Sequence, residues 1–187
     1  LIYFWRIFWF FSKIMTKIKF GTDGWRAIIA QDFTVDNVAR VTEATSRWLL
    51  KNFTAPSVVV GHDCRFAGEL FAETTTKVFI AHGIKVYLAK GFVSTPMISL
   101  GAVRLKTSLG IIITASHNPP SYNGYKIKGH YGGPLAPEHV QEIEDIIPPA
   151  AITSWQTIDL KEAADRGLLL DAPLEDMYIK HVEQSFD

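Results

Sequence analysis

The sequence has little cysteine, no net charge and no long apolar run, and each of these absences excludes a class of protein. Cysteine occurs once in 187 residues, as Cys64, which excludes an internal disulfide and fits a reducing cytoplasm. Net charge is missing, because 19 basic and 19 acidic side chains cancel and leave no overall field to attract nucleic acid or an acidic membrane. The most apolar stretch, residues 1–14, is shorter than the ~20 residues of a membrane-spanning helix. We therefore expect a cytoplasmic, globular protein with no nucleic acid and no membrane as partner.

Residues 1–14 differ from the rest of the chain, because aromatic and aliphatic side chains dominate them. They lack the basic start and the small-residue cleavage site of a signal peptide. We expect them to form an extension outside the fold, which would then begin near Met15. An anchor on a membrane surface is the alternative.

The stretch of residues 111–133 holds the most informative pattern. Three consecutive isoleucines that begin at Ile111 predict a short strand buried on both faces. Pro119 and Pro120 then forbid both a helix and central-sheet pairing. Ser116 therefore lies where a buried strand opens into an exposed loop, and such a loop on a rigid base can present a hydroxyl to a ligand.

The residues near Ser116 favour phosphoryl chemistry over acyl chemistry. His117 is adjacent in sequence, and neighbours in an extended chain point to opposite sides, so it is poorly placed to deprotonate the serine. The sequence also lacks a Gly-x-Ser-x-Gly elbow around this serine. Lys126, ten residues on, can return across the turn as a cation or a proton donor. A serine hydrolase is a further alternative, for which reaction of Ser116 with a fluorophosphonate probe is the test.

Strands and helices alternate along most of the chain. The patterns predict helices over residues 34–52, 68–82, 96–105 and 136–147, and strands over 57–61, 85–88, 111–114 and 125–128. Two more short strands, 17–20 and 27–30, are predicted to pair around a glycine turn. This order predicts the α/β class, with a three-layer α/β/α domain around a mostly parallel mixed sheet. Residues 150–167 have little periodicity, and an apolar helical stripe from Leu174 has nothing predicted to pack on.

Polar residues follow the predicted strand at 57–61. Ligands bind at the outgoing ends of the strands in open α/β sheets. We therefore expect one edge of the sheet to gather four residues: His62, Asp63, Thr95 and Ser116.

Two motifs together carry a resemblance to a known family. The loop Thr114-Ala115-Ser116-His117-Asn118-Pro119, with Asn123-Gly124-Tyr125-Lys126 behind it, resembles the phosphoserine loop of the α-D-phosphohexomutases, the phosphoglucomutase and phosphomannomutase family. Gly21-Thr22-Asp23-Gly24-Trp25-Arg26 resembles the opening motif of that family, in the same order and at an agreeing spacing. The resemblance covers roughly residues 17–134 and implies the phosphoserine-bearing domain I of such a protein.

The resemblance also implies a reaction. A phosphoryl group would move between O1 and O6 of a hexose phosphate through a hexose bisphosphate, which also acts as activator, and Ser116 would carry the phosphate between turnovers. Lys126 would act as acid or base on the sugar hydroxyl. His117 and Asn118 would position phosphate and substrate. Mg²⁺ would bind the phosphate on Ser116 and offset its charge.

Three further residues match the family as phosphate or substrate contacts. Arg26 would hold the phosphate, because the forked donors of a guanidinium match two phosphate oxygens. A salt bridge to Asp23 or Asp32 is the alternative for it. Asp63 and Arg65 resemble the Asp-x-Arg element of the family, and they either contact the ligand or brace one another and the neighbouring loop.

The sequence departs from the family in its completeness. Family members have four domains, and the second supplies an Asp-Gly-Asp-x-Asp loop for magnesium, whereas no Asp-x-Asp occurs here. We predict that residues 15–150 form domain I and that residues 151–187 form a linker and the first helix of a truncated second domain. Domains II to IV of the same protein would be its partners, and this chain alone would have little or no mutase turnover. The alternative is a stand-alone sugar-phosphate-binding module without catalysis.

Overall fold

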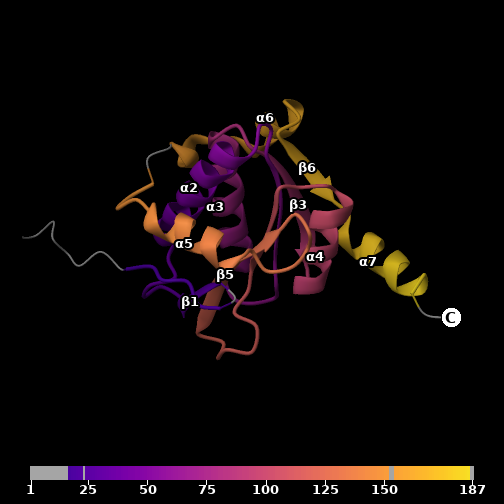
Figure 1. The fold of residues 1–187 in the computed structure, drawn as a ribbon, viewed down its shortest axis with the longest axis horizontal. Coiled ribbons are helices and arrows are strands. Elements are labelled where there is room, and N and C mark those ends of the chain that lie inside the picture. Colours follow the sequence, from indigo (N-terminus) through magenta and orange to yellow (C-terminus); the bar gives the residue numbers. More distant parts are fainter. Residues whose placement is uncertain (1–16, 23, 152–153, 186–187) are drawn as a thin grey trace, which may run out of the picture.

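A single mixed sheet organises the computed structural model, which describes residues 17–22, 24–151 and 154–185 (Figure 1). Its strands are β1 (Trp25–Ile28), β2 (Ser57–His62), β3 (Lys85–Phe92), β4 (Leu109–Ile113), β5 (Tyr122–Gly129) and β6 (Leu169–Ala172). They lie in the order β1-β5-β4-β2-β3-β6. The β2–β4, β2–β3 and β3–β6 pairs are parallel, and the β1–β5 and β4–β5 pairs are antiparallel. The predicted mostly parallel mixed sheet is confirmed.

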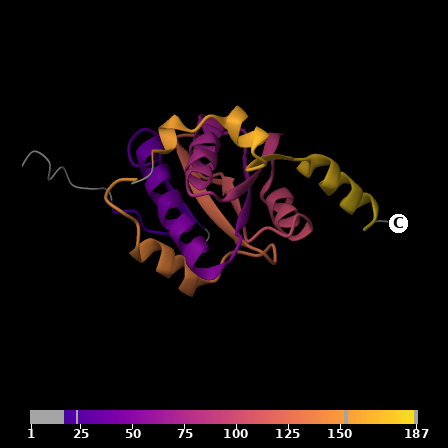
Figure 2. The same ribbon diagram turned by 90° about the horizontal axis from the view of Figure 1, so that it is seen from above.

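Helices cover both faces of the sheet. They are α2 (Val35–Asn52), α3 (Gly68–Ala81), α4 (Thr95–Arg104), α5 (Pro137–Asp145), α6 (Leu160–Asp165), α7 (Leu174–Glu183) and the short 3-10 helix η1 (Trp155–Thr157). Figures 1 and 2 show α2, α3 and α5 on one side of the strands and α4 with α7 on the other. The three-layer α/β/α arrangement predicted from the sequence is confirmed. Among the described residues, no helix combines the length and the apolar character needed to cross a bilayer.

The isoleucine run in β4 shows why both faces need helices. Ile111 and Ile113 pack into the apolar cluster beneath α2 and α3, whereas Ile112 packs into the separate cluster beneath α4. All three side chains are fully buried. Because successive side chains of a strand point to opposite faces, a strand covered on both sides needs a continuous apolar run.

Tyr125 on β5 is the largest fully buried side chain among the described residues. The hydroxyl of Thr42 donates to the carbonyl oxygen of Val38 at 2.8 Å, and its oxygen lies 3.3 Å from the phenol oxygen of Tyr125. Burial raises the pKa of the Tyr125 phenol well above its usual value of about 10. Above about pH 10, therefore, the unfolded chain releases a proton that the folded chain retains, and the free energy of unfolding falls as the pH rises.

The substitution Y125F should remove this part of the alkaline destabilisation. One retained proton is worth up to about 1.4 kcal/mol per pH unit, so the loss of stability above about pH 10 should be less steep in Y125F by up to that amount. Urea denaturation of both proteins at a series of pH values measures the difference. Parallel pH curves for the two proteins would contradict it.

The predicted hairpin of residues 17–20 with 27–30 is wrong. β1 pairs instead with β5, with Arg26 opposite Gly124, and residues 17–20 are not a strand. Their apolar alternation comes from packing, because Ile18 and Phe20 are buried in the core, and the Phe20 N–H donates to Glu144 Oε2 on α5 at 2.7 Å. A local pattern could not show that β1 has a partner about a hundred residues away in the sequence.

The chain beyond residue 150 contributes to the same sheet. Residues predicted to be a connector form η1 and α6, and β6 then adds a sixth strand beside β3, with Val86 opposite Leu169. The sheet therefore does not end at the domain boundary predicted at residue 150. The parallel pairing of β6 with β3 joins segments roughly 80 residues apart, which periodicity within either segment cannot reveal.

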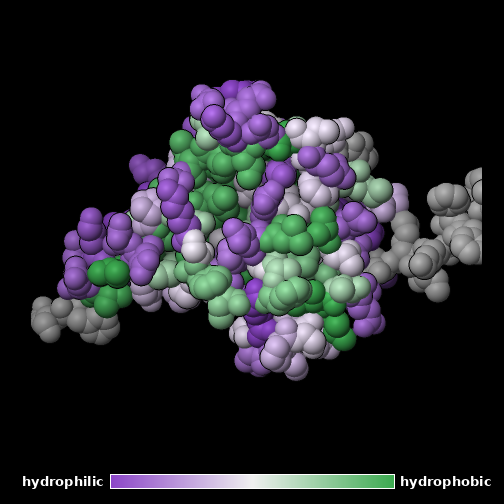
Figure 3. All heavy atoms as spheres, turned by 180° about the vertical axis from the view of Figure 1, so that it is seen from behind, coloured by the Kyte–Doolittle hydropathy of each residue, from purple (hydrophilic) through white to green (hydrophobic). Residues whose placement is uncertain are grey.

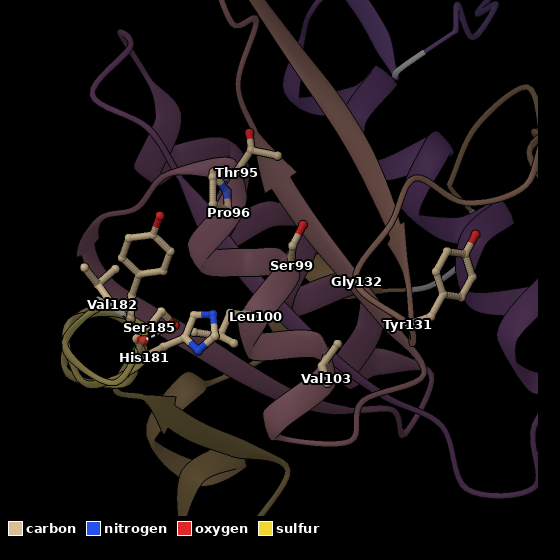
Figure 4. A pocket seen from close by; sticks show the side chains of 11 residues that line it. Thr95, Pro96, Ser99, Leu100, Val103, Tyr131, Gly132, His181, Val182 and Ser185 are labelled. Carbon is tan, nitrogen blue, oxygen red and sulfur yellow. Dashed lines mark hydrogen bonds between the residues drawn. The ribbon is translucent and has the colours of Figure 1, made fainter. Parts of the chain in front are cut away.

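Helix α7 does have something to pack on, contrary to the sequence prediction. Leu174 is 2% exposed, and it lies so close to α4 that a Cβ on Gly101 would meet its Cδ2 at 2.5 Å. Further along the helix there is an open pocket of about 690 Å³, which is lined by residues of α7 and α4 and by Tyr131 and Gly132 (Figure 4). In Figure 3, α7 projects from the body of the molecule, with a mostly hydrophilic surface and a small hydrophobic area. Whether α7 opens a second domain stays a prediction.

The substitution L174A should destabilise the chain by about 2–5 kcal/mol, because it removes a buried leucine and leaves a cavity against α4. V182A on the same helix is the matched control, because Val182 is 37% exposed and its truncation should change the free energy of unfolding by less than about 0.5 kcal/mol. Urea denaturation measures both. Equal, small effects would mean that α7 is not anchored on α4.

Candidate functional site

The serine loop begins where β4 ends. Thr114 and Ala115 are still buried, whereas Ser116 and His117 are exposed. Ser116 has a φ of 55°, a left-handed backbone conformation that costs a residue with a Cβ roughly 1–2 kcal/mol. Its N–H donates to Thr114 Oγ1 at 3.0 Å. The predicted position of the hydroxyl, exposed at the end of a buried strand, is confirmed.

Arg65 fastens this loop from the side of β2. Its Nη2 donates to the carbonyl oxygens of Ser116 and Asn118 at 2.8 and 2.6 Å. Its Nη1 donates to the carbonyl oxygens of Pro119 and Tyr122 at 2.9 and 3.0 Å. One guanidinium therefore satisfies four carbonyl groups of a loop that makes few backbone hydrogen bonds of its own.

Asp63 completes the attachment. Its Oδ1 accepts from the N–H of Arg65 at 2.9 Å, and its Oδ2 accepts from Thr114 Oγ1 at 2.5 Å. Oδ2 also lies 3.5 Å from Arg65 Nε. Of the two roles that the sequence allowed, these contacts are those of residues that brace one another and the neighbouring loop.

Arg26 reaches the loop from the other side. It leaves β1 opposite Gly124 of β5, and its Nη1 donates to Asn118 Oδ1 at 3.0 Å. Gly124 allows this approach, because a Cβ there would lie 2.5 Å from the carbonyl oxygen of Thr114 and 3.1 Å from Arg26 Cγ. The alternative partner Asp23 lies outside the described residues.

Lys126 lies on the same face of the sheet as Arg26. It is 4% exposed and stands opposite Ile112 of β4. Gly124 and Lys126 are two residues apart on one strand and so share a face, and Arg26 is the cross-strand neighbour of Gly124. Arg26 and Lys126, the two cations that the sequence singled out, therefore lie on one face of the sheet, in neighbouring rows of cross-strand side chains.

His117 is closer to the serine hydroxyl than the sequence suggested. Its Nδ1 lies 3.4 Å from Ser116 Oγ, at the long end of the hydrogen-bond range. The expectation that the two side chains point to opposite sides assumed an extended chain and is wrong here. The left-handed conformation of Ser116 turns the backbone and brings both side chains to the exposed side.

The two other residues expected at this edge differ in their surroundings: His62 ends β2 opposite Ile113, and Thr95 follows the end of β3. His62 is 7% exposed, and its Nδ1 lies 2.8 Å from the carbonyl oxygen of Asp63, so its ring is used within the fold. Thr95 begins α4 and lines the pocket next to α7 (Figure 4).

Two residues of the quoted motif received no role from the sequence. Thr114 links Asp63 to the N–H of Ser116. Asn123 is fully buried, donates from Nδ2 to the carbonyl oxygen of Phe66 and accepts from the N–H of Gly124. The available signal was a polar residue directly after a buried strand for Thr114 and within a buried strand for Asn123.

The described residues do not make a metal site. In the ranges 17–22, 24–151 and 154–185, no group of three or more His, Cys, Asp or Glu side chains is placed to hold an ion. Asp63, the carboxylate closest to the serine loop in the hydrogen-bond network, is engaged with Thr114 and Arg65. This donor set does not fit the coordination that Mg²⁺ requires.

The fold and the site define a three-layer α/β domain that presents an exposed serine at the edge of its sheet, in a loop that an arginine contacts, with a lysine on the neighbouring strand opposite Ile112. Residues 17–151 match the family model described as "Phosphoglucomutase/phosphomannomutase, alpha/beta/alpha domain I". The chain belongs to this family.

Relatives with different named activities share this domain. The phosphoribomutase of Saccharomyces cerevisiae is 34% identical over 165 residues, which cover 84% of this chain and 26% of that protein. The phosphoglucomutase of Staphylococcus haemolyticus is 32% identical over 172 residues, 89% of this chain and 31% of that protein. The crystal structure of a Thermus thermophilus protein assigned as a phosphomannomutase has a TM-score of 0.72 and 42% identity, covering 80% of this chain and 35% of that one. The chain thus spans about a quarter to a third of the relatives that it matches.

Proposed function

We propose that Ser116 is the phosphate carrier of a phosphohexomutase and that this chain forms the first domain of that enzyme. One observation carries the proposal: an exposed serine hydroxyl stands at the end of a buried strand, in a loop that Arg26 contacts, with Lys126 on the adjoining row of the same sheet face. Cations so placed suit a phosphoryl group, whose charge must be offset as it leaves one oxygen for another.

In the proposed reaction, the bond between phosphorus and Ser116 Oγ breaks while a bond to a hydroxyl oxygen of the hexose phosphate forms. The sugar hydroxyl loses a proton and Ser116 Oγ gains one, and Lys126 exchanges protons with the sugar oxygen. The hexose bisphosphate so formed then returns its other phosphate to Ser116. Arg26 and Asn118 would hold the phosphate through charge-assisted hydrogen bonds.

The remaining parts of the site would come from outside the described residues. Magnesium chemistry at a phosphorylated Ser116 would need further oxygen ligands, because this part of the chain does not group them. Because the chain spans only 26–35% of the relatives quoted above, we propose that domains II to IV of the same protein supply these ligands and the sugar contacts. A cytoplasmic setting is proposed because the single cysteine, Cys64, is free.

The test is phosphopeptide mass spectrometry of the protein purified from its source. We expect phosphate on the peptide that contains Ser116. The substrate is then sought by incubating the whole protein with glucose 1-phosphate and, separately, ribose 1-phosphate, because relatives are named for both sugars. A Ser116 that never carries phosphate would contradict the proposal, and binding of sugar phosphate without turnover by the whole protein would favour a binding module.

A further inference from the structure

We propose that Asp63 and Thr114 are positioning residues that hold Ser116 in its left-handed conformation before any phosphate arrives. The inference rests on the proposed function, because it explains how the carrier serine of that reaction is presented. It gives Thr114 a role. It also gives Asp63 a positioning role in place of the ligand contact that the family resemblance implied. Three hydrogen bonds hold Ser116 in this way: Thr114 to Asp63, the Ser116 N–H to Thr114, and Arg65 to the Ser116 carbonyl oxygen.

The hydroxyl of Thr114 has one proton and can give it to one acceptor. It gives that proton to Asp63 Oδ2 at 2.5 Å, because an ionised carboxylate can only accept. Its lone pairs are then left to accept the N–H of Ser116 at 3.0 Å. The charge of Asp63 thus fixes the direction of the chain of hydrogen bonds and gives the Ser116 N–H a defined acceptor.

Asp63 is itself held at both its backbone and its side chain. Its N–H donates to the carbonyl oxygen of Ile113, the last residue of β4, at 3.1 Å. Its Oδ1 accepts the N–H of Arg65 at 2.9 Å. Asp63 is therefore anchored through its backbone to the strand that precedes the serine loop and through its carboxylate to Arg65.

Arg65 binds the carbonyl side of Ser116. Its Nη2 donates to the carbonyl oxygen of Ser116, while Thr114 accepts the N–H of Ser116. Both peptide groups that flank the Ser116 Cα are thereby fixed, and neither of these contacts uses the exposed hydroxyl. Such preorganisation matters for phosphoryl transfer, because the attacking and leaving oxygens must be in line.

The test compares T114V with T107V in this chain. Valine keeps the shape and burial of threonine and removes the hydroxyl. Thr107 is the matched control, because it is also buried and its hydroxyl donates to the carbonyl oxygen of Leu109, at the opposite end of β4 from the serine. Amide hydrogen exchange and backbone chemical shifts, both measured by NMR, report the protection and the φ angle of Ser116.

We expect T114V to speed the exchange of the Ser116 amide by at least about tenfold and to move its shifts away from left-handed values, whereas T107V leaves both as in the wild type. T114S, which restores a hydroxyl, should recover most of the protection. Unchanged exchange and shifts in T114V would overturn the proposal. Equal changes in T107V would overturn it too, because the effect would then be general loosening of β4.

A kinetic arm separates positioning from binding. In the whole protein, T114V should lower kcat by about 100-fold, the loss typical of a misplaced reacting group, while KM for the sugar phosphate changes by less than about threefold. A rise in KM with kcat unchanged would overturn the positioning role. If the Ser116 amide behaves as expected but wild-type Ser116 never carries phosphate, the proposed function fails while the hydrogen-bond arrangement stands.

Discussion

Alanine in place of Ser116 should abolish the proposed phosphate on the serine loop and lower the proposed mutase activity of the whole protein by about a thousandfold or more, the scale seen when a covalent carrier is removed. The reason is chemical, because alanine has no oxygen to accept the phosphoryl group. The fold should survive, since Ser116 is exposed and alanine keeps the Cβ already accommodated there. Phosphopeptide mass spectrometry and a mutase assay measure the two effects.

The matched control for S116A is S121A. Ser121 is an exposed serine at the other end of the same loop, and the contact recorded for it uses its backbone carbonyl, which accepts the N–H of Ile29. S121A should retain both phosphate and activity. Wild-type phosphate content in S116A, or its loss in S121A alone, would assign the carrier role to a different residue.

Methionine in place of Lys126 should lower kcat of the whole protein by about 100- to 10,000-fold, the range for loss of a general acid or base. Methionine fills much of the volume of the buried lysine stem, so a large activity loss would not need a disrupted core. The amine that we propose exchanges protons with the sugar oxygen would be missing. Phosphate transferred to Ser116 before purification would be retained, because its return to substrate would be slow.

K128M is the control for K126M. Lys128 is also on β5 and is 5% exposed, but it stands opposite Gly110, one row further from the serine end of β4 than Lys126. A similar stability change in both variants with a loss of kcat in K126M alone would support the role of Lys126. Wild-type kcat in K126M would exclude it, and equal losses of kcat would point to strand damage.

Sequence reasoning worked best where the evidence was local. The isoleucine run predicted a strand buried on both faces, the prolines predicted the loop, and the amphipathic pattern predicted the helix that Thr34 caps. It failed where the partner was distant, as in the pairing of β1 with β5 and of β6 with β3. It also placed His117 incorrectly, because the left-handed backbone of Ser116 has no signal in its side chain.

The sequence by itself determined the α/β class, the family resemblance, and the identity of the serine, arginine and lysine that carry the proposed chemistry. These features follow from residue type and short-range spacing, which the chain carries before it folds. Only the tertiary structure decided that Asp63 and Arg65 fasten the loop, that Thr114 binds the N–H of Ser116, and that Arg26 and Lys126 share a face. Those relations join segments that are far apart in sequence, and the sheet register that brings them together is set by packing of the whole core.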